Sequence, residues 1–385
     1  GDGVFQYVVL EGEAGHQDAI VRTEYAVSTI IDNGVEVEKL AYGIANWNRA
    51  QAQTKMTQML AEYDKTYAYQ LPTEVYVEKI LPVAPLLSRI TEVYADAETG
   101  MAPGIIGLDP EWLDHFYEQC PAHLNDLMKL EQKNHPEAAQ QAEKMYAKVK
   151  MPFTYYPGYS TNAYDYQMLT VFLLTLFCVI IAAPVYSADY QTHADDILRC
   201  TRYGKRRLAV VKLASALVIT SVSFLLCASW HLVLSNSFFG WDMLKSSMQL
   251  VFSTVSLSDL NIGQLQLIVT AAGFACLLAS VCFTLFLSSR CKTTVSALAL
   301  SLLFFLSPII LFMSSSGNGV SWLRCILPSG GISILGGFAS EVTDFNFLHI
   351  GGYSLWAPFV ILGAALAEIP VFAGLSVRGY CRHFQ

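Results

Sequence analysis

Five long runs without Asp, Glu, Lys or Arg constrain this chain more than any other feature of its sequence. Between consecutive charged residues they contain 23, 29, 30, 31 and 23 residues, in a chain of 385. A helix needs about 20 apolar residues to cross the hydrocarbon layer of a bilayer, and an isolated strand would leave its backbone groups unpaired in lipid. The sequence therefore predicts five membrane-spanning helices, near residues 166–186, 211–235, 264–288, 293–313 and 356–377.

Charge divides the chain at about residue 165. Residues 1–165 contain 12 Lys and Arg against 24 Asp and Glu, a net charge of −12, whereas residues 166–385 contain 12 against 8, a net charge of +4. Only 15% of all residues are charged, whereas a soluble domain has about 25%. This composition excludes a wholly soluble globular protein, and the lack of a basic face argues against a nucleic-acid partner.

Lys and Arg are distributed unevenly among the segments between the predicted spans. Ten lie in segments 187–212 and 289–292 and in the tail from Arg378, and two lie in segments 236–263 and 314–355. Because Lys and Arg accumulate on the cytoplasmic side of a membrane, we expect the first set in the cytoplasm. Residues 1–165 then form an extracytoplasmic domain, since long domains cross the membrane largely regardless of charge.

The extracytoplasmic part is predicted to be a mainly helical soluble domain, which makes the whole chain all-α. Helical spacing of apolar residues favours helices over 16–32 and 35–67, and Pro110, Pro121 and Pro136 can each open a further helix at its first turn. The chain begins without Met and without a signal peptide. Because an external domain needs an export signal, we expect a leading span that precedes these residues.

The common motifs of catalytic and metal chemistry are absent from the sequence. Gly204-Lys205 is followed by Arg206, so there is no Walker A motif, and neither HExxH nor GxSxG occurs. The nine cysteines contain no CxxC pair, and the histidines of the first 165 residues show no close paired spacing. We therefore expect no enzyme activity, no metal and no cofactor on this chain.

Segment 187–210 is the most structured of the predicted cytoplasmic segments. Asp195 and Asp196 fall in the first turn of a short helix that begins at Thr192 or His193, where the helix dipole favours anions. An apolar stripe of helical spacing and a basic C-terminal end follow, with Gly204 as the residue after the helix. The residues predicted to contact a partner are Tyr190, Asp195, Asp196, Ile197, Leu198, Arg199, Arg202 and Gly204, and those predicted to anchor the next span at the lipid headgroups are Lys205, Arg206, Arg207 and Lys212. The alternative is an amphipathic helix that rests on the membrane surface.

One acidic residue lies inside a predicted span. Glu368 precedes Arg378 by ten residues, which places it about 15 Å from the cytoplasmic end of its helix and near the middle of the hydrocarbon layer. An acid at that depth usually faces protein or water, so we expect a structural or gating contact. The alternative is that Pro370 breaks the helix and moves Glu368 towards the interface.

The segment from Tyr164 to Thr220 resembles bacterial ABC transporter permeases of the type-2 exporter class. The resemblance rests on an apolar span that ends at Pro184, the acidic-aromatic pair Asp189-Tyr190, the short helix ADDILRCTRYG and the basic sequence KRRLAVVK that enters the next span. It covers residues 166–377, and it covers residues 1–165 only by position and helical character. In that family a large external domain lies between the first and second spans, so the resemblance implies six spans in the complete protein.

The resemblance also implies partners. An ABC ATP-binding subunit would supply ATP and Mg²⁺ and dock on the short cytoplasmic helix, and a second permease chain, identical or different, would complete the translocation unit in a bacterial cytoplasmic membrane. The alternative is a membrane sensor or assembly protein whose external domain binds a ligand and signals across the membrane.

Overall fold

The chain folds into two compact units, which are described separately. They comprise Gly1–Pro82 and Val83–Gln385, so the division falls earlier than the boundary at residue 165 that charge predicts. In this computed structural model the described residues are 4–12, 17–45, 51–53, 55, 56, 59, 79, 83–96, 101, 102, 110–158, 161–314 and 317–382.

The first unit contains a parallel strand pair. β1 (Val4–Glu11) pairs with β2 (Glu36–Ile44), and α1 (Gln17–Asp32) connects them. The predicted helix over 16–32 is confirmed, and Gly34 ends its turn at φ 80°. The helix predicted over 35–67 is wrong for residues 36–44, because this segment pairs with β1 as a strand. Residues 60–67 of that prediction lie outside the described residues.

The second unit begins with four helices: α4 (Ala84–Glu92), α5 (Pro110–Asp114), α6 (Phe116–Glu131) and α7 (Pro136–Tyr146). Their core contains Cys120, Leu124 and Met128 from α6 and Ala138, Ala142 and Tyr146 from α7, all buried. Pro110 and Pro136 open helices as predicted. The prediction for Pro121 is wrong, because α6 begins at Phe116 and runs through this proline.

Helices α4 and α7 are tied to the connection between the second and third spans. Tyr146 Oη donates a hydrogen bond to the Thr254 carbonyl over 2.9 Å. Ser253 Oγ donates to the Glu92 carboxylate, and Arg89 donates to the Phe252 carbonyl. This attachment is called the α4 anchor (Arg89, Glu92, Ser253).

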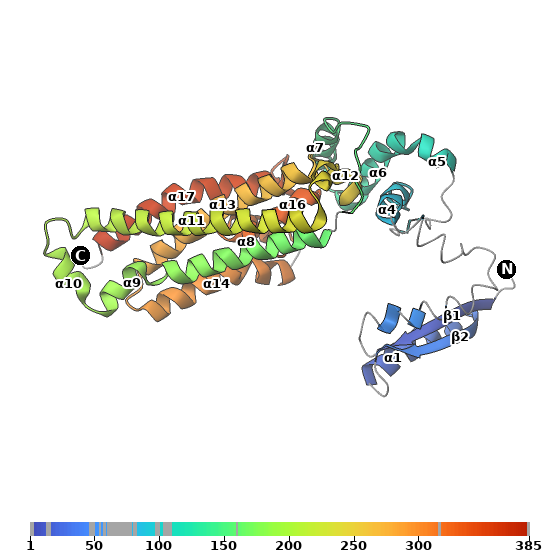
Figure 1. Cartoon of the computed structure of the whole chain (residues 1–385), viewed down its shortest axis with the longest axis horizontal. Coiled ribbons are helices and arrows are strands. Elements are labelled where there is room, and N and C mark those ends of the chain that lie inside the picture. The colour runs from blue at the N-terminus through green and yellow to red at the C-terminus, as the bar shows by residue number, and fades with distance from the viewer. Residues whose placement is uncertain are drawn as a thin grey trace. The chain divides into compact units, whose positions relative to one another are not determined.

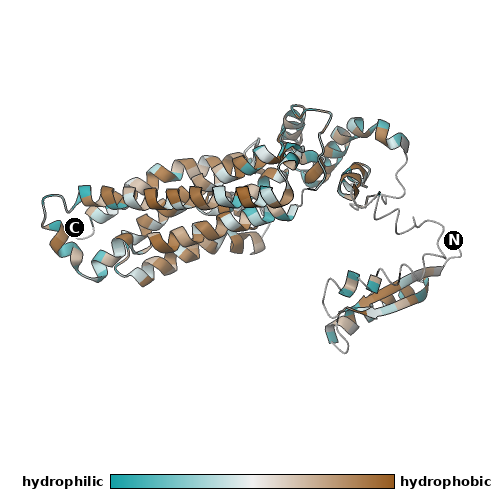
Figure 2. Ribbon diagram, in the orientation of Figure 1, coloured by the Kyte–Doolittle hydropathy of each residue, from teal (hydrophilic) through white to brown (hydrophobic). Residues whose placement is uncertain are grey.

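All five predicted spans are helices long and apolar enough to cross a membrane. They are α8 (Thr161–Ala182), which α9 (Pro184–Gln191) extends, α11 (Arg206–Phe239), α13 (Ile262–Ser288), α14 (Thr294–Ser314) and α17 (Ala357–Cys381). Figure 2 shows apolar residues along these helices and polar residues gathered towards their ends. By length and composition these helices are compatible with a multi-pass membrane protein.

The five helices form one bundle in which α13 is central. α13 is the most buried span and contacts α8, α11, α14 and α17, and its contacts with α17 are the most extensive in the protein. The bundle has an α10 end, with α9, α10 (Ala194–Arg199) and the last turn of α17, and an α7 end, with α7 and α12 (Met248–Val251) (Figure 1). In the half nearer the α7 end, the side chains of Asn236 and Gln266 exchange two hydrogen bonds of 3.1 Å, and Gln167 donates to the Gln266 carbonyl.

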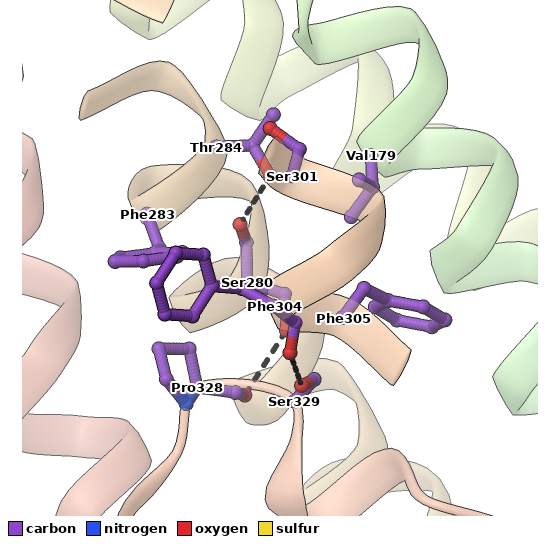
Figure 3. A pocket seen from close by; sticks show the side chains of 9 residues that line it. All are labelled: Val179, Ser280, Phe283, Thr284, Ser301, Phe304, Phe305, Pro328 and Ser329. Atoms are coloured by element: carbon purple, nitrogen blue, oxygen red, sulfur yellow. Dashed lines mark hydrogen bonds between the residues drawn. The ribbon is translucent and has the colours of Figure 1, made fainter. Parts of the chain in front are cut away.

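The segment between the last two spans folds back into the bundle, whereas the sequence predicted only a loop at one side. It comprises α15 (Asn318–Ile326), η4 (Gly330–Ile332), α16 (Phe338–Thr343) and the antiparallel hairpin of β3 (Phe347–Ile350) and β4 (Tyr353–Trp356). Ser280 Oγ donates to the Pro328 carbonyl over 3.0 Å, and Ser329 Oγ donates to the Phe304 carbonyl over 3.2 Å (Figure 3). Phe304 lies midway along α14, so the turn reaches the middle of the membrane region.

A buried ion pair closes this re-entrant segment. Arg324 Nη2 lies 2.7 Å from Glu341 Oε1, and both side chains are 4% exposed. Arg324 also donates to the Gly336 carbonyl. Because buried charges need partners, the pair holds α15 and α16 together.

Candidate functional site

The α10 end of the bundle contains the residues that the sequence predicts to bind a partner. There the first span is interrupted by Pro184, which opens α9 because it has no N–H to donate to the preceding turn. Tyr186 is fully buried, and its hydroxyl donates a hydrogen bond of 2.8 Å to the Ala209 carbonyl of α11. The backbone N–H groups of Tyr186 and Ser187 donate to Ser288 Oγ of α13 over 3.0 and 3.1 Å. These bonds fix α9 to two other spans.

Two further side chains of α9 contact the remaining elements. Asp189 Oδ2 lies 2.5 Å from Lys212 Nζ of α11, and the same ammonium donates to the Val185 carbonyl over 3.0 Å. Gln191 Oε1 accepts hydrogen bonds of 3.0 and 2.7 Å from the backbone and side chain of Thr294, where α14 begins. Lys212 was predicted as a headgroup anchor; instead its ammonium is bound inside the protein.

Helix α10 begins as predicted after His193, which adopts φ 57° in the left-handed region. Its inner face contains Asp195, which is 1% exposed, and Arg199. Arg199 Nε lies 3.5 Å from Asp195 Oδ2, and Arg199 Nη2 donates to the Tyr380 carbonyl over 2.5 Å. The guanidinium also lies 5.1 Å from the centre of the Tyr380 ring, a distance typical of a cation–π contact.

Tyrosine rings complete this junction with the last span. Tyr190 is buried and stacks on Tyr380 with ring centres 5.9 Å apart, and the ring centre of Tyr186 lies 5.2 Å from that of Tyr380. Ser289 accepts a hydrogen bond from Tyr190 Oη over 3.4 Å. We call these residues the α9–α10 junction: Tyr186, Asp189, Tyr190, Asp195, Arg199, Lys212 and Tyr380.

The outer face of α10 is open. Ile197 is 75% exposed, and Asp196 and Thr201 are also exposed, whereas Ala194 and Leu198 are half-buried. The sequence predicts one apolar stripe of Ala194, Ile197, Leu198 and Thr201, but within α10 its residues are split between the two faces of the helix, and Thr201 lies beyond the end of the helix. Ile197, exposed beside Asp196, therefore forms a small apolar contact point on a polar surface.

Gly204 is not the residue that directly follows α10, which is where the sequence predicted it. α10 ends at Arg199, and Gly204 is not among the glycines of positive φ. A Cβ at Gly204 would lie 1.5 Å from the Leu198 carbonyl oxygen. Glycine is needed there because the loop after α10 passes so close to the helix.

The basic residues from Arg202 to Arg207 are exposed. Lys205 is the residue before α11, and Arg206 and Arg207 form its first turn. The guanidinium groups of Arg202 and Arg207 lie 5.4 and 4.5 Å from the centre of the Tyr203 ring. This arrangement suits residues at a membrane surface, where the apolar ring and the charges have different surroundings.

Glu368 lies apart from the junction. It precedes Tyr380 by 12 residues on α17, a separation of about 18 Å along the helix. α17 continues through Pro370, so the helix break that the alternative for Glu368 required is absent. Glu368 is half-buried, and its Oε2 atom is buried without a hydrogen-bond partner among the described residues.

Sequence reasoning missed two members of the junction, Tyr186 and Tyr380, and it also missed Ser288, whose hydroxyl accepts hydrogen bonds from α9. A signal for the first was available, because Tyr186 and Tyr190 are four residues apart and share one helix face. Tyr380 had no such signal, because nothing in the sequence around it indicates that it contacts α9 and α10. The described residues contain no group of three metal-ligating side chains.

Comparison with known proteins gives a match over a short segment of the chain. No protein-family profile matches the chain, and no solved structure matches it. The D-galactose/methyl-galactoside binding periplasmic protein MglB of Haemophilus influenzae is 38% identical over 60 residues, which are 16% of this chain and 18% of that protein. The chain thus spans less than a fifth of the relative that it matches, and the match shows similarity of one segment.

Proposed function

We propose that the chain is the membrane-spanning subunit of an ATP-driven ABC transporter, an exporter that a separate ATP-binding subunit energises. The observation that carries the proposal is the α9–α10 junction. α9 extends the first span and contacts α11, α13 and α14, and Arg199 of α10 binds Tyr380 of α17. A protein that moves α10 would act on all five spans.

The exposed face of α10 would be the docking site for the ATP-binding subunit. Ile197 would enter an apolar groove on the ATP-binding subunit, as amphipathic helices do when they bind partners. ATP and Mg²⁺ would bind that subunit, and a second permease chain would complete the pathway. Residues 187–210 would lie in the cytoplasm of a bacterial cell, and residues 110–158, with α6 and α7, would lie outside.

The test is recovery of an ATP-binding subunit with the chain, purified from the native host. Ile197→Asp should reduce that recovery at least about tenfold, because it places a charge in an apolar contact, while the amount of chain in the membrane stays unchanged. Ile350→Asp is the matched control, since Ile350 is 58% exposed in β3, at the opposite end of the bundle. Equal recovery with wild type and Ile197→Asp would contradict the docking assignment.

A second function has one specific observation in its favour. A membrane sensor or assembly protein would bind a ligand outside the membrane, and the 60-residue match is to a periplasmic protein named for galactoside binding. Isothermal titration of the purified chain with D-galactose and methyl-galactoside tests this function. Saturable heat, together with no ATP-binding subunit in the native purification, would favour the sensor over the transporter.

A further inference from the structure

Two histidine rings stack at the α7 end of the bundle. His135 directly precedes α7, and His349 lies in β3, 214 residues later. Their ring centres are 3.5 Å apart, and their planes differ by 9°. α7 also packs against β4 of the same hairpin. The stack therefore joins the α6–α7 helices to the segment between the last two spans.

His349 is linked to the re-entrant helix α15 through its backbone. Its N–H donates to Asn318 Oδ1 over 3.0 Å, and its carbonyl accepts from Asn318 Nδ2 and Trp322 Nε1, both over 2.9 Å. Its Nδ1 lies 2.8 Å from Ser354 Oγ of β4. A displacement of His349 would therefore disturb its hydrogen bonds to both α15 and β4.

The charge state of the two rings decides whether this contact is favourable. Neutral imidazoles stack well, whereas two imidazolium rings in the same position repel each other. From α7, the facing titratable groups are His135 and Glu137. From α15 and β4, the contacts to His349 are Asn318, Trp322 and Ser354, which do not titrate near neutral pH.

Burial lowers the pKa of His349, the neighbouring His135 lowers it further, and Glu137 opposes both effects. A histidine with a lowered pKa binds its proton more weakly when the protein is folded than when it is unfolded. Its contribution to stability is therefore present above the ordinary histidine pKa and is lost as the pH falls through that range. Acid should weaken the stacked arrangement.

We propose that the His135–His349 stack is an acid-sensitive joint: when both rings are protonated, α7 separates from the β3–β4 hairpin and α15 is released. The joint responds to pH on the side of the membrane where α7 lies. It does not depend on what the protein transports or on its partners. Protonation moves only protons from the solvent to the ring nitrogens, so no other reactant is needed.

The test is hydrogen–deuterium exchange of the full chain in lipid nanodiscs at pH 8.0 and pH 5.5, with each rate divided by the intrinsic rate at that pH. The peptides that cover 318–326 and 347–356 should lose protection about tenfold at pH 5.5, because repulsion between the charged rings favours the separated arrangement. His135→Phe keeps an aromatic ring and His135→Gln keeps a polar group, and neither titrates. Both variants should keep their protection at pH 5.5.

His115→Phe is the matched control, because His115 is exposed and lies before α6; it should lose protection as wild type does. If wild type shows no loss at pH 5.5, the proposal is wrong. The same conclusion follows if His135→Gln loses protection as wild type does, because another group, such as buried His123, would then be responsible. Should His135→Phe fail to fold at pH 8.0, His135→Gln decides the question.

Discussion

At the scale of single residues, the α9–α10 junction depends on charges that are held away from water. Asp195 is almost fully buried, and Arg199 is its cation, with a side chain that is 15% exposed. A buried ion pair adds little net stability, because desolvation offsets the attraction between the charges. Removal of one partner is different, because it leaves the other charge buried and uncompensated.

Arg199→Ala should therefore loosen α10 strongly. Removal of one partner of a buried pair costs about 3–5 kcal/mol, so deuterium exchange of residues 187–200 should rise steeply. The double change Asp195→Asn and Arg199→Gln removes both charges and should restore most of the protection. Arg202→Ala is the control, since Arg202 is an exposed arginine that follows Arg199 by three residues. Equal exchange in Arg199→Ala and Arg202→Ala would show that the buried pair does not hold α10.

At the scale of elements, hydropathy and helix signals predicted the spans and the short helix, because both depend on residues close together in sequence. β2 was missed, because its pairing with β1 joins residues about 32 positions apart, as in the Val4–Glu36 pair. The inner face of α10 was missed for a similar reason. Nothing near Arg199 in the sequence indicates that Tyr380, 181 residues later, receives its hydrogen bond.

The α4 anchor gives a prediction about pH. Burial raises the pKa of Glu92, while Ser253 and Arg89 oppose that rise. The folded protein therefore binds this proton more tightly than the unfolded chain does, and the contribution to stability is present at low pH and is lost as the pH rises through the raised pKa. Glu92→Gln imitates the protonated acid.

Glu92→Gln should raise the melting temperature at pH 8 by roughly 2–4 °C and change it little at pH 4.5. Thermal unfolding followed by circular dichroism at the two pH values measures the difference. Glu118→Gln, an exposed substitution on α6, should have no effect at either pH. A lower melting temperature for Glu92→Gln at pH 8 would mean that the charge of Glu92 stabilises the anchor.

At the scale of the whole molecule, the bundle has two ends of different character. The α10 end contains six basic residues from Arg199 to Lys212, both included. The α7 end contains the histidine stack and the α4 anchor. Because Lys and Arg prefer the cytoplasmic side of a membrane, this asymmetry predicts that the α10 end lies in the cytoplasm. It is open to a direct chemical test through the native thiol of Cys200, which is exposed.

A membrane-impermeant maleimide should label Cys200 only after the cells are permeabilised. Cys291→Ser and Cys381→Ser remove the two half-exposed thiols at the same end. Glu118→Cys, introduced into this background, should be labelled in intact cells, because α6 lies at the opposite end of the bundle. Labelling of Cys200 from outside intact cells would invert the assigned orientation.

The attachment of α9 to several spans has a consequence for how robust the junction is. Its contacts with α11, α13 and α14, and those of Arg199 with Tyr380, act as parallel connections and not as links in a series. If the contacts acted in series, the loss of one would uncouple α10 from the spans. Because they act in parallel, the remaining contacts still hold α9 in place. Contacts that share one element in this way are not additive. Redundancy of this kind lets α9 tolerate the loss of one of its contacts with α11, α13 or α14, whereas α10 depends on the single buried pair of Asp195 and Arg199.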